Sequence, residues 1–321
     1  MEALLVNRLP EGKEWGYEPK WDGFRCLAFK RRTTVTLRSK SGRPLERYFP
    51  DIVSMLENLT TKTFVLDGEL LVKGAHGYSF SDLQMRLHPA ASRVKMLAQK
   101  QPATFVIFDA LETETGTNVM SAPLSERRLV LERFYKTYCS KSKAIQLSPQ
   151  TDSVAEAMGW LSSSGWFIDG IVAKNSRDAY VPGERVMKKY KAIRTADCVV
   201  GGFRYGRDSE EVGSLLLGLY DETGYLNHVG FTAGIAKADR PSLTKKLEKL
   251  IHEPGFTGNA PGAPSRWSTE RSTQWKPLAP KLVVEVTFDH VTADRFRHGT
   301  RLVRFRPDKS PRQCTMDQLR R

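Results

Sequence analysis

The chain has 321 residues, is 40% hydrophobic and 27% charged, and contains no low-complexity tract or fixed repeat. This composition excludes a disordered or fibrous protein and allows two globular domains with separate cores. Its net charge of +14, from 50 Lys and Arg against 36 Asp and Glu, favours a polyanionic partner; nucleic acid is the commonest, although a ribosome-adjacent or membrane-surface role fits the same number.

The chain lacks the usual signals for export, membrane insertion and zinc binding. No apolar run approaches the ~20 residues that span a bilayer, and residues 1–10 do not resemble a secretory signal, so we expect a cytoplasmic protein. The four cysteines form no Cys-x-x-Cys pair, and the six histidines show no His-x-x-x-His spacing. Any metal is therefore expected to have oxygen ligands, as magnesium does.

Residues 1–193 alternate short strand-like and helix-like segments, which predicts an α+β domain of antiparallel sheets with flanking helices. Apolar runs with strand character occur at Cys26–Phe29, Thr34–Leu37, Phe64–Val72, Thr104–Phe108 and Gly170–Ala173. Helical periodicity occurs at Phe49–Leu59, Ser81–Leu87, Ala91–Lys100, Leu124–Tyr138 and Ser153–Ser163.

Residues 194–321 have a different character, and we expect a second domain, a small all-β barrel of the oligonucleotide/oligosaccharide-binding (OB) type. Five strand-like runs occur here, at Cys198–Phe203, Ser214–Tyr220, Leu226–Phe231, Leu282–Phe288 and Leu302–Phe305. One helix is predicted at Pro241–His252, and Pro254–Thr273, rich in Gly, Pro, Ser and Thr, is expected to be a long mobile loop. The hinge between the domains is expected near Ala192–Ala196.

One short motif points to covalent chemistry. Lys20 stands in the run Lys20-Trp21-Asp22-Gly23-Phe24-Arg25, between a strand start and an expected turn. A lysine amine can act as a nucleophile when it is neutral, which burial and cationic neighbours favour. Four matching letters are a weak signal alone, because such a lysine is usually a solvated strand end.

Five further segments carry charged or aromatic residues in a suggestive order. Asp67-Gly68-Glu69 is expected to end a strand in a turn, Phe108-Asp109 to end another strand, and Lys189 and Lys191 to share one face of a strand. The remaining two are Asp169-Gly170 with Lys174, and Arg306-Pro307-Asp308-Lys309. Each has an ordinary interpretation: hairpin turns, a core phenylalanine, a wet strand face, a solvated tail.

Taken together, these six motifs resemble the covalent nucleotidyltransferase superfamily, and within it the ATP-dependent DNA ligases. The similarity runs from Glu18 to Lys309. The segment Glu-Pro-Lys-Trp-Asp-Gly-Phe-Arg is similar to the corresponding motif of the minimal bacterial repair enzymes, ligase C and the ligase domain of ligase D.

The resemblance implies three steps. Lys20 takes AMP from ATP and passes it to the 5′-phosphate of a DNA nick, and the 3′-hydroxyl then displaces AMP. Lys174, Lys189 and Lys191 would stabilise charge on the phosphates. Asp308 and Lys309, in the second domain, would orient the pyrophosphate while that domain closes over ATP, and the domain would then swing away to expose another face to DNA.

The resemblance also assigns the nucleotide and metal contacts. Phe108 would stack on adenine and Glu18 would sit beside its exocyclic amine, whereas Phe105 is expected on the other face of its strand. Arg25, assisted by Lys40, would reach the ribose and later the nick phosphate. Glu69 and Asp169 would hold Mg²⁺ or Mn²⁺.

Three positions depart from the family pattern. Asp169 stands where Glu is usual, Met187 where an aromatic is frequent, and Lys40 where Arg is usual. The first shortens the reach to a metal by one methylene, and the last replaces a bidentate phosphate contact by a point charge.

The implied partner is nicked double-stranded DNA, bound without sequence preference by a monomeric, bacterial, nucleoid-associated enzyme, with DNA-repair proteins as further candidates. Three alternatives share some of these features: an RNA-capping guanylyltransferase, an RNA ligase, and a catalytically idle nucleic-acid-binding barrel protein. Retention of Lys20, Glu69, Lys189 and Lys191 together argues against the last, because binding alone needs no such set.

Overall fold

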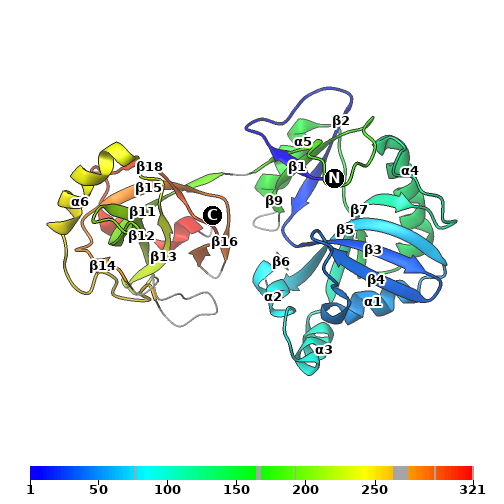
Figure 1. The fold of residues 1–321 in the computed structure, drawn as a ribbon, viewed down its shortest axis with the longest axis horizontal. Helices are drawn as coiled ribbons and strands as arrows, with labels where there is room; N and C mark the ends of the chain where they lie inside the picture. The colour runs from blue at the N-terminus through cyan, green and yellow to red at the C-terminus, as the bar shows by residue number, and fades with distance from the viewer. Residues whose placement is uncertain (76, 164–167, 192, 263–273, 293, 320–321) are drawn as a thin grey trace. The chain divides into compact units, whose positions relative to one another are not determined.

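Figure 1 shows the computed structural model, which describes residues 1–75, 77–163, 168–191, 193–262, 274–292 and 294–319. The chain divides into two compact units, Met1–Ala192 and Ile193–Arg321. Within the described residues, none of the helices has the length and apolar character that a membrane crossing requires.

The first unit contains two sheets. The larger has the strand order β4 (Thr34–Ser39), β3 (Phe24–Arg31), β5 (Thr63–Gly74), β7 (Ala103–Glu112) and β8 (Ile145–Leu147), with β6 (Gly77–Tyr78) paired to β5. The smaller has the order β1 (Ala3–Leu5), β10 (Met187–Tyr190), β9 (Ile168–Asn175) and β2 (Trp15–Trp21). The pairs are antiparallel except β7–β8 and β1–β10. The fold class expected from the sequence is confirmed.

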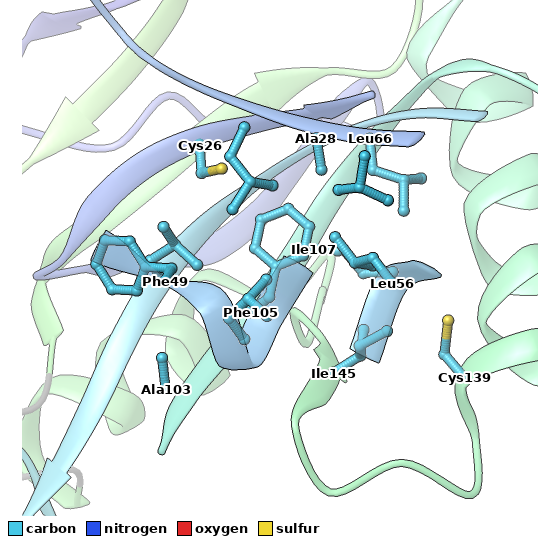
Figure 2. Packing of buried hydrophobic residues seen from close by; sticks show 14 of the residues in the cluster. Cys26, Ala28, Phe49, Leu56, Leu66, Ala103, Phe105, Ile107, Cys139 and Ile145 are labelled. Carbon is cyan, nitrogen blue, oxygen red and sulfur yellow. The ribbon is translucent and has the colours of Figure 1, made fainter. Parts of the chain in front are cut away.

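Helices cover one face of the larger sheet and bury its apolar side chains. They are α1 (Pro50–Glu57), α2 (Phe80–Met85), α3 (Ala91–Lys100) and α4 (Leu124–Phe134), which continues into a π-helical turn at Tyr135–Cys139. Helix α5 (Val154–Ser163) instead packs against β2 and β9 of the smaller sheet. Figure 2 shows Ala28, Leu66, Phe105 and Ile107 converging from three strands on Leu56 of α1. Because strand side chains alternate between faces, Arg25 and Glu69 lie on the opposite face, away from this core.

Two expected strand ends are wrong. Strand β5 runs without a turn through Asp67-Gly68-Glu69, and β7 continues past Phe108 and Asp109 to Glu112. The register instead shifts between Asp67 and Gly68, so Phe108 is an extra residue in β7, a β-bulge. Gly68 serves close packing: a Cβ there would stand 2.6 Å from Phe105 Cε2 and from the Val106 carbonyl oxygen.

The second unit is built on one sheet with the order β13 (Leu226–Thr232), β12 (Val212–Tyr220), β11 (Arg194–Tyr205), β15 (Val283–Phe288) and β18 (Arg301–Phe305). An isolated bridge joins Thr232 of one edge strand to Thr300, just before the other, so the two edges of the sheet meet there. Smaller elements are β14 (Lys276–Pro277), which pairs with β11, the hairpin β16 (Val291–Thr292) and β17 (Arg295–Phe296), and α6 (Arg240–Glu248). Short 3-10 helices occur at Glu46–Tyr48, Lys237–Asp239, Pro311–Gln313 and Met316–Leu319.

The expected loop Pro254–Thr273 falls partly outside the described residues, at 263–273. Its described part is anchored, because Phe256 is buried and its ring contacts those of His228 and Trp275 edge-on. Of the expected hinge, Ala192 is outside the described residues and Arg194 already begins β11.

Candidate active site

The two sheets of the first unit enclose a cavity of about 270 Å³. Of the predicted site residues, Glu18, Lys20, Arg25, Lys40, Glu69, Phe108, Lys174 and Lys189 line it, and they come from both sheets. The remaining lining residues are Glu2, Ala3, Pro19, Trp21, Val172 and Met187. The cavity therefore gathers predicted site residues that are up to 171 positions apart in sequence, from Glu18 to Lys189.

Lys20 points into this cavity from β2 and is paired with a carboxylate. Its Nζ lies 2.5 Å from Asp169 Oδ2, and Lys191 Nζ lies 3.5 Å from the same oxygen. The Lys20 side chain is 25% exposed and that of Asp169 is 9% exposed. One carboxylate thus draws two lysine amines together at the cavity wall.

A β-bulge turns Asp169 toward Lys20. In the β2–β9 ladder Lys20 pairs with Gly170 but Trp21 pairs with Ile168, which leaves Asp169 as the extra residue. Asp169 and Lys174 are five positions apart, so a regular strand would place them on opposite faces. With the bulge, both side chains reach partners on β2, Lys20 and Glu18.

Glu18 and Lys174 form a second ion pair deeper in the wall, with 2.9 Å between Glu18 Oε1 and Lys174 Nζ. Burial raises the pKa of Glu18, against the opposing effect of Lys174. Apart from this ion pair, Oε1 has no hydrogen-bond partner among the described residues, so it can accept a further hydrogen bond. Lys174 Nζ also donates to the Phe108 carbonyl oxygen at 3.3 Å and lies 4.7 Å from the centre of the Phe108 ring.

Arg25 is held by a network that the sequence did not indicate. Its Nε and Nη2 donate to the two oxygens of Asp67, at 3.1 and 2.7 Å, and the Tyr180 hydroxyl donates to Asp67 Oδ2 at 2.8 Å. Asp67 is fully buried. A bidentate carboxylate of this kind fixes the guanidinium plane at the cavity edge. The only available signal was the period of two that places Asp67 on the same face as Glu69.

The cavity also shifts the ionisation of two lining residues. Desolvation lowers the pKa of Lys189, and the nearby charges of Lys20, Lys191 and Lys40 lower it further. Desolvation raises the pKa of Glu69 to about 8, although Lys20 and Arg25 oppose this shift. Glu69 keeps part of its surface open to the cavity. Lys40, at the rim, is 3.0 Å from Glu2 Oε1.

The carboxylates at the cavity offer oxygen ligands for a divalent cation. Within the described residues no cluster of three or more His, Cys, Asp or Glu side chains could hold a metal. Glu69 nevertheless fits such an ion: it lies beside a cavity open to ligand, and a nearby cation would relieve the cost of ionising it. Asp169 has a suitable oxygen, but that oxygen is engaged by Lys20.

Comparison of the sequence with known proteins shows which family this chain belongs to. The family model "ATP dependent DNA ligase domain" matches residues 5–191, and "ATP dependent DNA ligase C terminal region" matches residues 208–309. The chain belongs to the ATP-dependent DNA ligases. Family membership thus confirms the recognition made from the motifs, and it sets aside the capping-enzyme, RNA-ligase and idle-binder alternatives.

Individual relatives of this chain are also DNA ligases. DNA ligase C of Mycobacterium tuberculosis is 39% identical over 100% of this chain and 93% of its own length. DNA ligase C2 of Mycolicibacterium smegmatis is 39% identical over 99% of this chain and 93% of its length. A solved structure of mycobacterial DNA ligase D complexed with ATP and MES is 26% identical, with a TM-score of 0.51 over 98% of both chains.

This ligase is thus an ATP-using enzyme of DNA repair that joins 3′-hydroxyl and 5′-phosphate ends at nicks in duplex DNA, through a lysyl-AMP and a DNA-adenylate. Its remaining predicted site residues, Asp308 and Lys309, lie in the second unit. There Asp308 accepts hydrogen bonds from Arg306, which hold its pKa down to about 2, and Lys309 Nζ donates to Asp197 Oδ2 at 2.6 Å. Asp197 was not singled out from the sequence.

Proposed function

We propose that Lys20 is the nucleophile of this ligase. Its Nζ lone pair attacks the α-phosphorus of ATP, an N–P bond forms, and the bond from that phosphorus to the bridging oxygen breaks. The electron pair leaves with pyrophosphate, and the amine releases a proton. The observation that supports this assignment is the position of Lys20 in the wall of a cavity that four further lysines line or border.

The surrounding charges suit this step. Lys174, Lys189 and Lys191 would stabilise the negative charge that develops on the phosphate oxygens. Asp169 Oδ2, 2.5 Å from the amine, is placed to hold the proton that Lys20 must lose before it attacks. Once the amine has become a neutral phosphoramide and Asp169 has passed its proton to solvent, the Asp169 carboxylate is released from that ion pair.

We assign recognition of the base to Phe108 and Glu18. The Phe108 ring would stack on adenine, and Glu18 Oε1, which is buried and contacts Lys174, would accept from the exocyclic amine. Guanine carries an oxygen acceptor at that position, which a carboxylate repels. Lys174 now lies over the Phe108 ring, so stacking on that face would require Lys174 to shift toward the α-phosphate.

Mg²⁺ or Mn²⁺ would be held by Glu69, joined by Asp169 when its lysine partner is neutralised. When bound, the ion would add positive charge beside the phosphates. Desolvation keeps Glu69 substantially protonated near neutral pH until a cation offsets that cost.

The later steps would use the basic rim and the second unit. Arg25 and Lys40, on the cavity edge, would bind the ribose and then the 5′-phosphate of the nick. Asp308 and Lys309 would orient pyrophosphate during the first step only, when the second unit closes over ATP. We further propose that the ligase acts on DNA as a monomer, with DNA-repair proteins as its recruiting partners.

The deciding experiment is self-labelling with ATP carrying a radioactive α-phosphate. We expect labelled AMP to remain on the protein through denaturing electrophoresis. Lys20→Arg, which keeps the charge but not the nucleophile, should abolish it. Lys188→Ala, on β10 but outside the cavity lining, is the matched control and should label normally. Full labelling of Lys20→Arg, or stronger labelling by GTP than by ATP, would contradict the proposal.

A further inference from the structure

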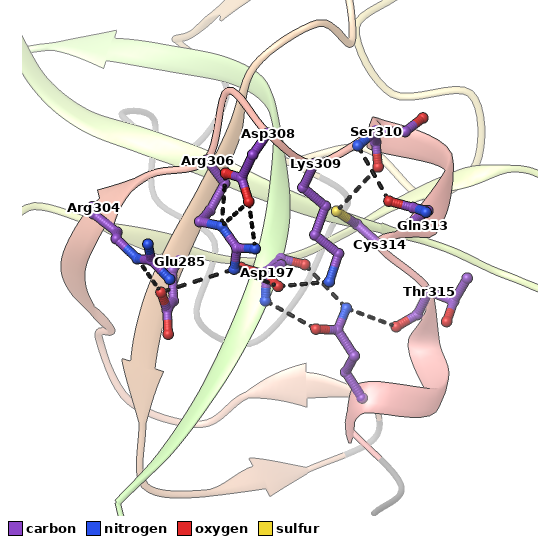
Figure 3. A network of polar contacts seen from close by, with 11 residues as sticks. Asp197, Glu285, Arg304, Arg306, Asp308, Lys309, Ser310, Gln313, Cys314 and Thr315 are labelled. Atoms are coloured by element: carbon purple, nitrogen blue, oxygen red, sulfur yellow. Dashed lines mark hydrogen bonds and ion pairs between the residues drawn. The ribbon is translucent and has the colours of Figure 1, made fainter.

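One carboxylate in the second unit gathers the residues proposed to act on pyrophosphate. Asp197 lies on β11, three residues after the strand begins, and is 9% exposed. Its Oδ1 accepts from Arg306 Nη1 at 2.9 Å, and its Oδ2 accepts from Lys309 Nζ at 2.6 Å. Arg306 in turn donates to Asp308, so all three charged residues of the Arg-x-Asp-Lys motif are connected to Asp197 (Figure 3).

Asp197 is itself held rigidly. Its backbone N–H donates to Gln318 Oε1 at 2.9 Å, and its carbonyl oxygen accepts from Gln318 Nε2 at 3.0 Å. In the β11–β15 ladder Asp197 pairs with Glu285. The carboxylate therefore projects from a clamped strand, whereas Asp308 lies on an exposed turn, its side chain 62% exposed.

The two cations gain order from this contact. Lysine and arginine side chains are long and flexible, and they lose rotamer freedom when their position is fixed. A cation that must meet pyrophosphate with its geometry already set avoids part of that loss during the reaction. Lys309, at 24% side-chain exposure, is held within reach of solvent, so the contact with Asp197 orients the amine without burying it.

We propose that Asp197 is a positioning residue for the first step: it holds Arg306 and Lys309 in the geometry that accepts pyrophosphate as the N–P bond to Lys20 forms. This inference rests on the proposed role of Asp308 and Lys309 in that step. Asp197 touches neither nucleotide nor DNA in this mechanism and acts only through the two cations.

The test compares three reactions in Asp197→Asn: self-labelling across a range of ATP concentrations, reversal of the labelled enzyme by pyrophosphate, and sealing of a pre-adenylated nick without ATP. We expect the first two to slow by about tenfold or more, since misplacement of a charged group costs up to about a hundredfold, and the third to change by less than about threefold. The pyrophosphate concentration needed for reversal should rise, which a purely structural defect would not produce.

Three further variants keep the test decisive. Asp197→Glu retains the charge and should recover part of the lost rate. Glu285→Gln is the matched control: it removes the carboxylate opposite Asp197 on the same face, which is bonded to Arg304 and lies 4.0 Å from Arg306, and should behave as wild type. If Asp197→Asn does not fold, Gln318→Ala, which loosens the Asp197 backbone, should show the same pattern in milder form.

Each outcome separates the two proposals. Normal labelling and reversal in Asp197→Asn, with both slowed in Lys309→Ala, would overturn the positioning role alone. Equal loss in all three reactions, in a variant that melts as wild type does, would also overturn it. Normal labelling in both Lys309→Ala and Asp308→Ala would instead overturn the role proposed for the motif itself.

Discussion

Gly170 lies directly against the carbonyl oxygen of Tyr190: a Cβ at position 170 would stand 2.0 Å from that oxygen. Gly170 also has a φ of +149°, in the region that favours glycine. The contact brings the end of β10 close to the bulge at Asp169. Because Lys189 and Lys191 flank Tyr190, the absence of a side chain at Gly170 decides how near these amines come to Lys20.

We expect Gly170→Ala to destabilise the first unit by about 1–3 kcal/mol, as forced overpacking does, and to slow self-labelling by at least about tenfold. The strand would have to move away from Tyr190 and carry the lysines with it. Melting curves and labelling rates check both effects. Gly159→Ala, in α5 with open space around the new methyl group, should label as wild type does and should lose no stability, because alanine favours a helix interior over glycine. Wild-type labelling in Gly170→Ala would contradict this account of the site.

Glu18→Gln should reduce the preference for ATP over GTP. The amide of glutamine can turn its NH₂ toward the guanine oxygen, which the carboxylate cannot do. We expect the ratio of labelling rates to fall by about tenfold, which corresponds to about 1.4 kcal/mol. Competition labelling with both nucleotides measures this ratio. An equal loss with ATP and GTP would mean that Glu18 serves only to neutralise Lys174.

Glu69 should make stability depend on pH in the nucleotide-free and metal-free enzyme. Its pKa in the folded state is raised to about 8, above the value in the unfolded chain, so the folded state binds the proton more tightly. This contribution to stability is fully present below about pH 4.3, the ordinary pKa of Glu, and is lost as the pH rises through 8.

Glu69→Gln should therefore melt at a higher temperature than wild type at pH 8.5, with little difference at pH 5. Mg²⁺ should raise the melting temperature of wild type at pH 8.5 and not that of Glu69→Gln. Thermal melts across this pH range give both results. Glu210→Gln, at an exposed position outside the cavity, is the control. A pH-independent difference would show that Glu69 is ionised throughout.

The residue that follows Phe108 in β7, Asp109, forms a buried ion pair with Arg127 whose contribution to stability can be measured. Arg127 is fully buried, and its Nε and Nη2 donate to the two oxygens of Asp109 at 2.9 and 3.0 Å. Arg127→Met leaves the Asp109 charge unpaired and should cost about 3–5 kcal/mol. The double variant Arg127→Met/Asp109→Leu should recover most of that loss. Denaturant unfolding of the single and double variants tests this; additive losses would refute the coupling.

The sequence located the strands that carry apolar runs and missed those that do not. Strand β2 was not predicted, because Glu18 and Lys20 on one face break the apolar pattern, and β1 and β8 have only three residues each. The helix at Ala91–Lys100 has the predicted bounds. The turn expected at Asp67-Gly68 was wrong. The glycine is needed there because the Phe105 ring leaves no room for a side chain, and the chain does not reverse direction.

By itself the sequence determined the chemistry: an ordered set of lysines, carboxylates and one aromatic that identifies the family, together with the alternation that builds the core. Only the tertiary structure decided which of these groups meet. Bulges at Asp169 and Phe108 change which face a side chain takes, and the partners Asp67 and Asp197 act across strands far apart in the chain. Local pattern records side-chain type and period, whereas register and cross-strand contact depend on packing between segments that no local window contains.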